Sequence, residues 1–205
     1  MTYLNLCAET SLLSVKTTTP KKITTSSGKE IFIYDDLYDL TERSYFYSFA
    51  LNSKYSPLGA DTKFLEHRKD FNLTSNFTED DLIGLKFWAS KSSKQLEKHF
   101  LGMRIDNVRI NLSTLSDNNR IHVDNTLHKA AYCRTLLYYF NMEWKIEWGG
   151  GLLITDDNMK EIEATISYVP GRVIILDGTI PHCISAPTNL APSYRFSLAI
   201  QYESE

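Results

Sequence analysis

The chain has no long apolar run, little net charge and few cysteines. None of its 205 residues belong to a stretch of the roughly 20 apolar residues that span a bilayer, and the first residues lack the basic and apolar segments of a secretory signal. A formal net charge of −3 with interspersed signs gives no broad basic surface for nucleic acid phosphates. We therefore expect a cytoplasmic protein that binds neither membranes nor nucleic acid.

Cysteine usage bears on the compartment, and chain length bears on the number of domains. The three cysteines, Cys7, Cys133 and Cys183, are odd in number and widely spaced, so no disulfide framework is indicated and a reducing compartment fits best. The length suits one domain with a substantial core. We expect a single domain over residues 1–205, in which 1–103 form a supporting region of helices and strands and 104–205 form the core that carries the site.

The first half of the chain shows helical spacing. We expect a polar connector, a short strand and two helices, at residues 17–28, 30–34, 36–52 and 78–100 respectively. The second helix has the clearer start, because Thr78 can cap it with Asp81 three residues later. Its apolar face is expected to pack on a sheet.

Beyond Gly102 the apolar period changes to two. Val108, Ile110 and Leu112 alternate with Asn107, Arg109 and Asn111. Strands are expected near residues 104–115, 120–124, 132–141, 150–155, 163–169, 172–177, 182–186 and 194–203, separated by Gly- and Pro-containing turns. This order predicts a mainly β fold, a double-stranded β-helix (a cupin-like jelly roll) with N-terminal α-helices bracing one sheet.

The most informative motif is His122-Val123-Asp124, followed by His182. On a strand, side chains two apart share a face, so His122 and Asp124 can approach one metal ion. Two imidazoles and one carboxylate are the ligands of a non-haem iron site with open coordination positions. Any single histidine is more often a surface or core residue, but the ordered set is more specific.

Arg195 follows on the last predicted strand. There Arg195, Ser197 and Ala199 face one way and the apolar residues between them face the other. A guanidinium that points inward needs an anionic partner, either a bound carboxylate or an acidic side chain in a surface salt bridge. Arg172 is a weaker alternative, because its place beside a Pro-Gly turn suggests a solvated side chain.

These residues resemble the iron(II)- and 2-oxoglutarate-dependent dioxygenases, and among them the prolyl 4-hydroxylase-like branch. The resemblance covers roughly residues 120–202. The order and spacing of the motifs in this range are similar to those in the catalytic domain of hypoxia-sensing prolyl hydroxylases. It rests on HVDN at 122–125, TLLYYFN at 135–141 with Trp144, GGGL at 149–152, PGRV at 170–173 running to Pro181 and His182, and then Arg195-Phe196-Ser197. The segment between His182 and Arg195 is a few residues longer here than in that branch.

The resemblance implies a role for each site residue. His122, Asp124 and His182 would bind Fe(II), Arg195 would hold the distal carboxylate of 2-oxoglutarate, and Tyr139 and Ser197 would donate hydrogen bonds to it. The reaction would consume O2 and 2-oxoglutarate, release succinate and CO2, and hydroxylate a substrate C–H bond. Within this family L-ascorbate can serve as the reductant.

The substrate is less well defined. The resemblance favours a prolyl residue in a peptide or protein, and a free amino acid or another small molecule stays open. Trp144, Trp148 and Arg68 are candidate substrate contacts, with simple aromatic packing as the alternative for the two tryptophans. Residues 53–71 are either a lid or a plain surface loop.

Two other classes remain open. One is a non-catalytic jelly-roll module that retains a metal for sensing or interaction, and the other is a cupin-type metal enzyme without a 2-oxo acid. The second would leave Arg195 and Tyr139 without a role. A homo-oligomer that associates through an edge strand or the aromatic rim is also open.

Overall fold

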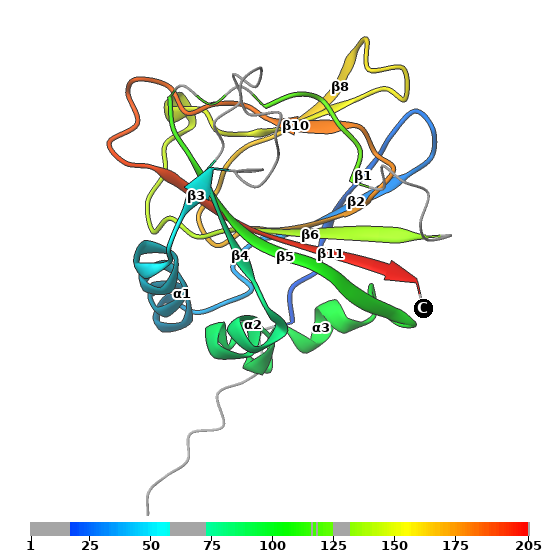
Figure 1. Cartoon of the computed structure of the whole chain (residues 1–205). Helices are drawn as coiled ribbons and strands as arrows, with labels where there is room; N and C mark the ends of the chain where they lie inside the picture. Colours follow the sequence, from blue (N-terminus) through cyan, green and yellow to red (C-terminus); the bar gives the residue numbers. More distant parts are fainter. Residues whose placement is uncertain (1–16, 58–72, 116, 118, 125–131, 205) are drawn as a thin grey trace, which may run out of the picture.

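Two antiparallel sheets stack face to face in the computed structural model, which describes residues 17–57, 73–115, 117, 119–124 and 132–204 (Figure 1). The strands are β1 Lys21–Thr24, β2 Glu30–Tyr34, β3 Ser56–Pro57, β4 Leu73–Phe77, β5 Met103–Ser113, β6 Cys133–Tyr139, β7 Leu152–Thr155, β8 Ile162–Ile166, β9 Val173–Asp177, β10 His182–Ile184 and β11 Arg195–Ser204. The large sheet has the order β1-β2-β9-β6-β11-β5-β4-β3 and the small sheet the order β10-β7-β8. The predicted jelly roll is confirmed.

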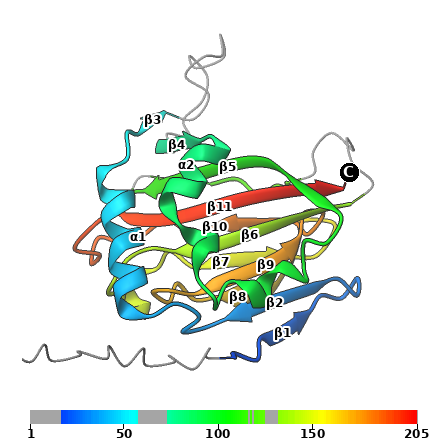
Figure 2. The ribbon, with the colours of Figure 1, turned by 90° about the horizontal axis from the view of Figure 1, so that it is seen from below.

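Helices cover only the outer face of the large sheet (Figure 2). The 3-10 turn η3 Ile146–Trp148 lies elsewhere and contributes Trp148 to the core between the sheets. The covering helices are α1 Leu40–Asn52, α2 Glu79–Leu85 and α3 Lys94–Glu97, with the 3-10 turn η2 Phe87–Ala89. Their buried side chains pack on the outward-facing residues of β5, β6, β9 and β11, including Val108, Leu136, Val173 and Leu198. The prediction that N-terminal helices brace one sheet is therefore confirmed. Among the described residues, no helix is both long and apolar enough to cross a membrane.

The second apolar core lies between the two sheets. Leu137, Ile174 and Ala199 of the large sheet face Leu152 and Ile154 of the small sheet across this layer. Because side chains alternate along a strand, each central strand of the large sheet contributes to both cores. Polar side chains on the inner face of the large sheet therefore point into the layer between the two sheets.

Both helix starts follow capping rules, but the predicted second helix is too long. The Thr78 hydroxyl accepts a hydrogen bond from the Asp81 amide, and the Asp81 carboxylate accepts one from the Thr78 amide, as expected. Helix α2 then ends at Lys86, whose φ of 57° lies in the left-handed region. Beyond it the Ser93 hydroxyl bonds the carbonyls of Trp88 and Ser90, an alternative to helical pairing that serine favours. Likewise α1 begins after its cap Asp39, later than predicted.

Two other predictions need correction. The polar connector at 17–28 contains strand β1, which pairs with β2 through a turn at Gly28, where φ is 81°. The segment 120–124 is no strand and forms only an isolated bridge between His122 and His182. Short polar segments can gain strand pairing from a neighbouring edge, or lose it, without any change in their own pattern.

Candidate metal centre

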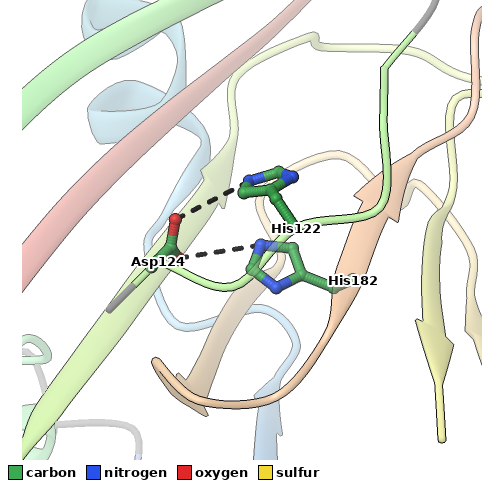
Figure 3. Close-up of side chains that lie close together, drawn as sticks. All are labelled: His122, Asp124 and His182. Atoms are coloured by element: carbon green, nitrogen blue, oxygen red, sulfur yellow. Dashed lines mark ion pairs between the residues drawn. The ribbon is translucent and has the colours of Figure 1, made fainter. Parts of the chain in front are cut away.

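Three potential metal ligands converge between the sheets. The ligand atoms of His122, Asp124 and His182 all lie within 4.8 Å of one another, and Figure 3 shows the two imidazoles on one side of the carboxylate. Each histidine Nε2 lies 3.7 Å from an oxygen of Asp124. The His122 side chain is 45% exposed whereas the other two are 5% exposed, so the cluster is reached by solvent from the His122 side.

Backbone hydrogen bonds fix the spacing of the three residues. His122 and His182 exchange both N–H···O bonds, at 3.0 and 2.9 Å, so they lie directly opposite each other. The Asp124 amide donates to the Gly178 carbonyl, and the Gly178 amide donates to the Cys133 carbonyl. A Cβ at Gly178 would lie 2.0 Å from the Cys133 sulfur, so only glycine fits. Cys133 and Cys183 are both free thiols.

Both imidazoles are oriented for metal binding through Nε2. His122 Nδ1 lies 2.9 Å from the Arg120 carbonyl, and His182 Nδ1 lies 2.8 Å from the Ile180 carbonyl. A carbonyl can only accept, so each Nδ1 carries the proton and each Nε2 presents a lone pair. Such a backbone partner for the second ring nitrogen is typical of metal-binding histidines.

The carboxylate of Asp124 is held by two further side chains. The Gln201 amide donates to Oδ1 at 2.7 Å and the Thr135 hydroxyl donates to Oδ2 at 2.5 Å. Gln201 in turn accepts from Asn107 at 3.3 Å. These residues were missed in the sequence, although Gln201 continues the inward-facing alternation that includes Arg195 and Ser197.

The electrostatics favour an ionised Asp124 and a neutral His182. Burial by itself would raise the pKa of Asp124, but His182, the Thr135 hydrogen bond and the Arg109 charge outweigh burial and hold the pKa below its ordinary value. Burial lowers the pKa of His182, although Asp124 opposes this. Ionised Asp and neutral His are the forms that bind a metal ion.

Arg195 lies further along the same inner face and is fully buried. Its Nε donates to the Gly150 carbonyl at 2.8 Å and one terminal nitrogen donates to the Ser197 hydroxyl at 3.0 Å. The other terminal nitrogen has no hydrogen-bond partner among the described residues, and neither has the hydroxyl of Tyr139. Ser197 accepts from Arg195, so its own proton is free to donate. The second terminal nitrogen of Arg195 and the hydroxyls of Tyr139 and Ser197 can therefore all donate to one bound acceptor.

Aromatic rings and a glycine shape the Arg195 pocket. The guanidinium carbon lies 5.0 Å from the ring centre of Tyr139 and 4.7 Å from that of Tyr168, and the two rings stack. Gly150 has a φ of 75°, and a Cβ there would lie 2.8 Å from the Arg195 side chain. Burial raises the pKa of Tyr139, although the nearby charge of Arg195 opposes this, so the phenol stays protonated and can donate. The second glycine of the GGG run is therefore required by the approach of Arg195.

A small cavity of about 100 Å³ adjoins the metal ligands. Its other lining residues are mainly polar and come from β5, β6, β10, β11 and a neighbouring loop: Arg109, Asn111, Ser113, Asn119, Thr135, Leu137, Ile184 and Ala199. Ala199 and Leu137 are two strand positions from Ser197 and Tyr139 on the same face. The inner face of β11 and β6 thus leads from the metal ligands to the Arg195 pocket.

Other predicted residues lie elsewhere. Arg172 makes a two-pronged ion pair with Asp35, at 2.7 and 2.8 Å, and also binds the Ser167 carbonyl, so it has its own partners and little solvent exposure. The expectation of a solvated Arg172 was wrong, but Arg172 is not the arginine with open donors. Trp144 and Trp148 are each 9% exposed and pack in the inner core.

The structure does not test the predicted substrate contacts. The packing of the two tryptophans matches the alternative left open in the sequence, and their role as substrate contacts stays a prediction. Arg68 and most of the predicted lid, residues 58–71, lie outside the described residues. The only described part of that loop with regular structure is the short strand β3.

Comparison with known proteins finds likeness in structure alone. No family model matches the chain, and no curated protein matches it. Among solved structures, a prolyl hydroxylase from Trichoplax adhaerens in complex with a hypoxia inducible factor peptide is similar, with a TM-score of 0.64 and 16% identity, covering 85% of this chain and 83% of that one.

Two further solved structures are similar to the same extent. HygX from Streptomyces hygroscopicus, with nickel and 2-oxoglutarate bound, has a TM-score of 0.63 at 10% identity, covering 88% of this chain and 84% of that one. A 2-oxoglutarate–Fe(II) oxygenase family oxidoreductase from Burkholderia pseudomallei has a TM-score of 0.62 at 12% identity, covering 84% of each. The chain thus has the fold found in 2-oxoglutarate oxygenases and prolyl hydroxylases.

Proposed function

We propose that this protein is an iron(II)- and 2-oxoglutarate-dependent dioxygenase that hydroxylates a C–H bond. The observation that carries the proposal is the buried Arg195, whose free terminal nitrogen lies with the open donors of Tyr139 and Ser197 on the inner face of the large sheet. Thr135 and Gln201 of the same face hold Asp124. An unpaired buried guanidinium is costly, and a carboxylate suits its donors. A cupin-type enzyme without a 2-oxo acid, or a simple metal-binding module, would leave this pocket without a purpose.

The donor set also fits the metal. His122, Asp124 and His182 would hold Fe(II) through two Nε2 atoms and one carboxylate oxygen, and this ligand set leaves open positions for the 2-oxo acid and dioxygen. When both are bound, they would supply oxidative decarboxylation to succinate and CO2, coupled to insertion of one oxygen atom into the substrate C–H bond. Ascorbate as an accessory reductant and a cytoplasmic location stay predictions.

The chain's own residues would bind 2-oxoglutarate and orient the metal ligands. Arg195, Tyr139 and Ser197 would fix the distal carboxylate of 2-oxoglutarate, so that its 2-oxo acid end points along the inner face toward the metal. Thr135 and Gln201 would keep both oxygens of Asp124 in place. Neutral Nε2 atoms on both histidines would remain free to bind the metal because the Nδ1 protons are engaged by carbonyls.

For the substrate, we favour a prolyl residue in a peptide or protein. Two neighbours support this: the Trichoplax adhaerens enzyme, whose structure contains a peptide, and a Pseudomonas putida prolyl-4-hydroxylase with a TM-score of 0.58 at 15% identity. A free amino acid or another small molecule is the second candidate, because the cavity beside the ligands is small.

Succinate formation tests the reaction class. Purified protein is given Fe(II), 2-oxoglutarate and a library of proline-containing peptides, and succinate and oxygen incorporation are measured by NMR and mass spectrometry. His122→Ala and Asp124→Ala should abolish 2-oxoglutarate turnover. The control variant Asp106→Ala removes an exposed carboxylate that lies outside the site, and it should retain turnover. Turnover that persists in both metal-site variants would end the proposal.

A further inference from the structure

The guanidinium of Arg109 lines the cavity beside the candidate metal ligands. Arg109 stands on β5 directly opposite Ala199 of β11, so its side chain is on the same inner face as Arg195. Its charge acts on both Asp124 and His182 across the cavity. Arg109 is therefore close to where the reaction proposed above would take place.

This guanidinium is not used by the fold. Among the described residues, no side chain or carbonyl accepts a hydrogen bond from Arg109 or forms an ion pair with it. Two other arginines have clear partners, since Arg172 pairs with Asp35 and Arg104 with Glu203.

Among the described residues, the nearby acid Asp124 forms no hydrogen bond or ion pair with Arg109, and its ion-pair contacts are to the two imidazoles. Both oxygens of Asp124 already accept hydrogen bonds from Gln201 and Thr135, and the same carboxylate is needed between the two imidazoles. The neighbouring lining residues Asn111 and Ser113 are neutral. Arg109 thus lines the cavity with a guanidinium that no acid among the described residues pairs with directly.

We propose that Arg109 is a specificity-determining residue that binds a carboxylate of the substrate and thereby holds the adjoining C–H bond beside the metal. The planar fork of a guanidinium matches a carboxylate with two parallel hydrogen bonds, which fixes orientation as well as position. The small volume, about 100 Å³, leaves little space between that carboxylate and the reacting carbon. The inference rests on the proposed function and narrows its substrate class to molecules with a carboxylate next to the hydroxylated group.

Such a carboxylate has two sources, a free amino acid or chain terminus and the side chain of an adjacent acidic residue. Matched probes distinguish them. N-acetylproline and N-acetylprolinamide differ only in the terminal carboxylate, whereas acetyl-Pro-Asp-NH2 and acetyl-Pro-Asn-NH2, both amidated at the C-terminus, differ only in the side chain.

Binding is measured without turnover. The Mn(II)-substituted protein with 2-oxoglutarate is titrated with each probe, and paramagnetic broadening of the probe's NMR signals gives both its affinity and its proximity to the metal. We expect the acid of one pair to bind at least about tenfold more tightly than its amide, as for loss of one charge-assisted contact. Arg109→Gln should remove that preference, and Arg109→Lys should keep part of it. The control Arg104→Gln, on the same strand but outside the cavity, should retain it in full.

Several results would overturn the inference. The inference would fail if, with the wild-type protein, the acid and the amide of both probe pairs showed equal broadening or none. It would also fail if Arg109→Gln kept an unchanged preference for the acid. A tenfold loss of 2-oxoglutarate affinity in Arg109→Gln with the probe preference intact would instead assign Arg109 to the cosubstrate. Failure of the wild type to bind 2-oxoglutarate at all would count against the proposed function, and is detected separately by isothermal titration before any probe is added.

Discussion

Gln201 should control metal affinity although it does not touch the metal. Its amide donates to Oδ1 of Asp124 at 2.7 Å, and the acceptor is an ionised, nearly buried carboxylate. A hydrogen bond to a charged group contributes about 1.5–3 kcal/mol, and loss of an outer partner of a ligand typically weakens metal binding by roughly 10- to 100-fold. We therefore expect Gln201→Leu to weaken Zn(II) binding by roughly 10- to 100-fold, about 1.4–2.7 kcal/mol.

The assay is competition for Zn(II) against a chromophoric chelator, with urea unfolding measured in parallel. Thr135→Val removes the donor to the other oxygen and should have an effect of similar size. Asn107→Ala removes only the 3.3 Å contact to the Gln201 carbonyl oxygen and should change affinity by less than about threefold. If Gln201→Leu bound Zn(II) within about twofold of the wild type while His122→Ala lost it, then Gln201 would not position Asp124.

Two further variants test the packing around the site, and a pH series tests a buried histidine in the outer core. Gly178→Ala should lower the free energy of unfolding in urea by about 1–3 kcal/mol because its Cβ would meet the Cys133 sulfur at 2.0 Å, and Cys133→Ala should restore most of the loss; an undiminished effect in the double variant would refute this cause. Gly150→Ala should displace Arg195 and reduce 2-oxoglutarate affinity at least about tenfold in calorimetry, with Zn(II) affinity unchanged; equal losses of both would contradict it. Burial, aided by the charges of neighbouring cations, lowers the pKa of His99 from 6.5 to about 4, so the folded state favours the neutral ring and its stability falls as pH drops from 6.5 toward 4. Between pH 7 and 5 the free energy of unfolding should fall by about 2 kcal/mol more in the wild type than in His99→Gln, and parallel pH profiles would reject this role.

Local sequence rules accounted for the ladder of strands and for the residues with distinctive chemistry. Period-two spacing located the core strands, and the His-x-Asp motif with a late histidine located the metal ligands that the structure brings together. The same alternation placed Arg195 and Ser197 on the inner face. The strand positions depend on the alternation of side chains along a strand, which tertiary contacts do not change. The candidate metal ligands were found from residue type and order instead, because 120–124 forms no strand.

The missed features depend on contacts between distant segments. Gln201 and Thr135 are ordinary polar residues until strand pairing places them opposite each other and next to Asp124. The segment 120–124 looks like a strand, but one bridge to His182 is all the pairing it makes. The long predicted helix ends at Leu85, and its C-cap Lys86 has a left-handed φ of 57°, a break that a count of apolar residues does not detect.

The central claim is that Arg195 and the three metal ligands together bind Fe(II) and 2-oxoglutarate. The most direct measurement is the anaerobic visible absorption of the Fe(II) protein before and after addition of 2-oxoglutarate, for the wild type, Arg195→Ala and the surface control Arg104→Ala. We expect a new charge-transfer band in the wild type and in Arg104→Ala that weakens in Arg195→Ala, because the distal carboxylate loses its partner. Absence of any band in the wild type at saturating 2-oxoglutarate would contradict the claim.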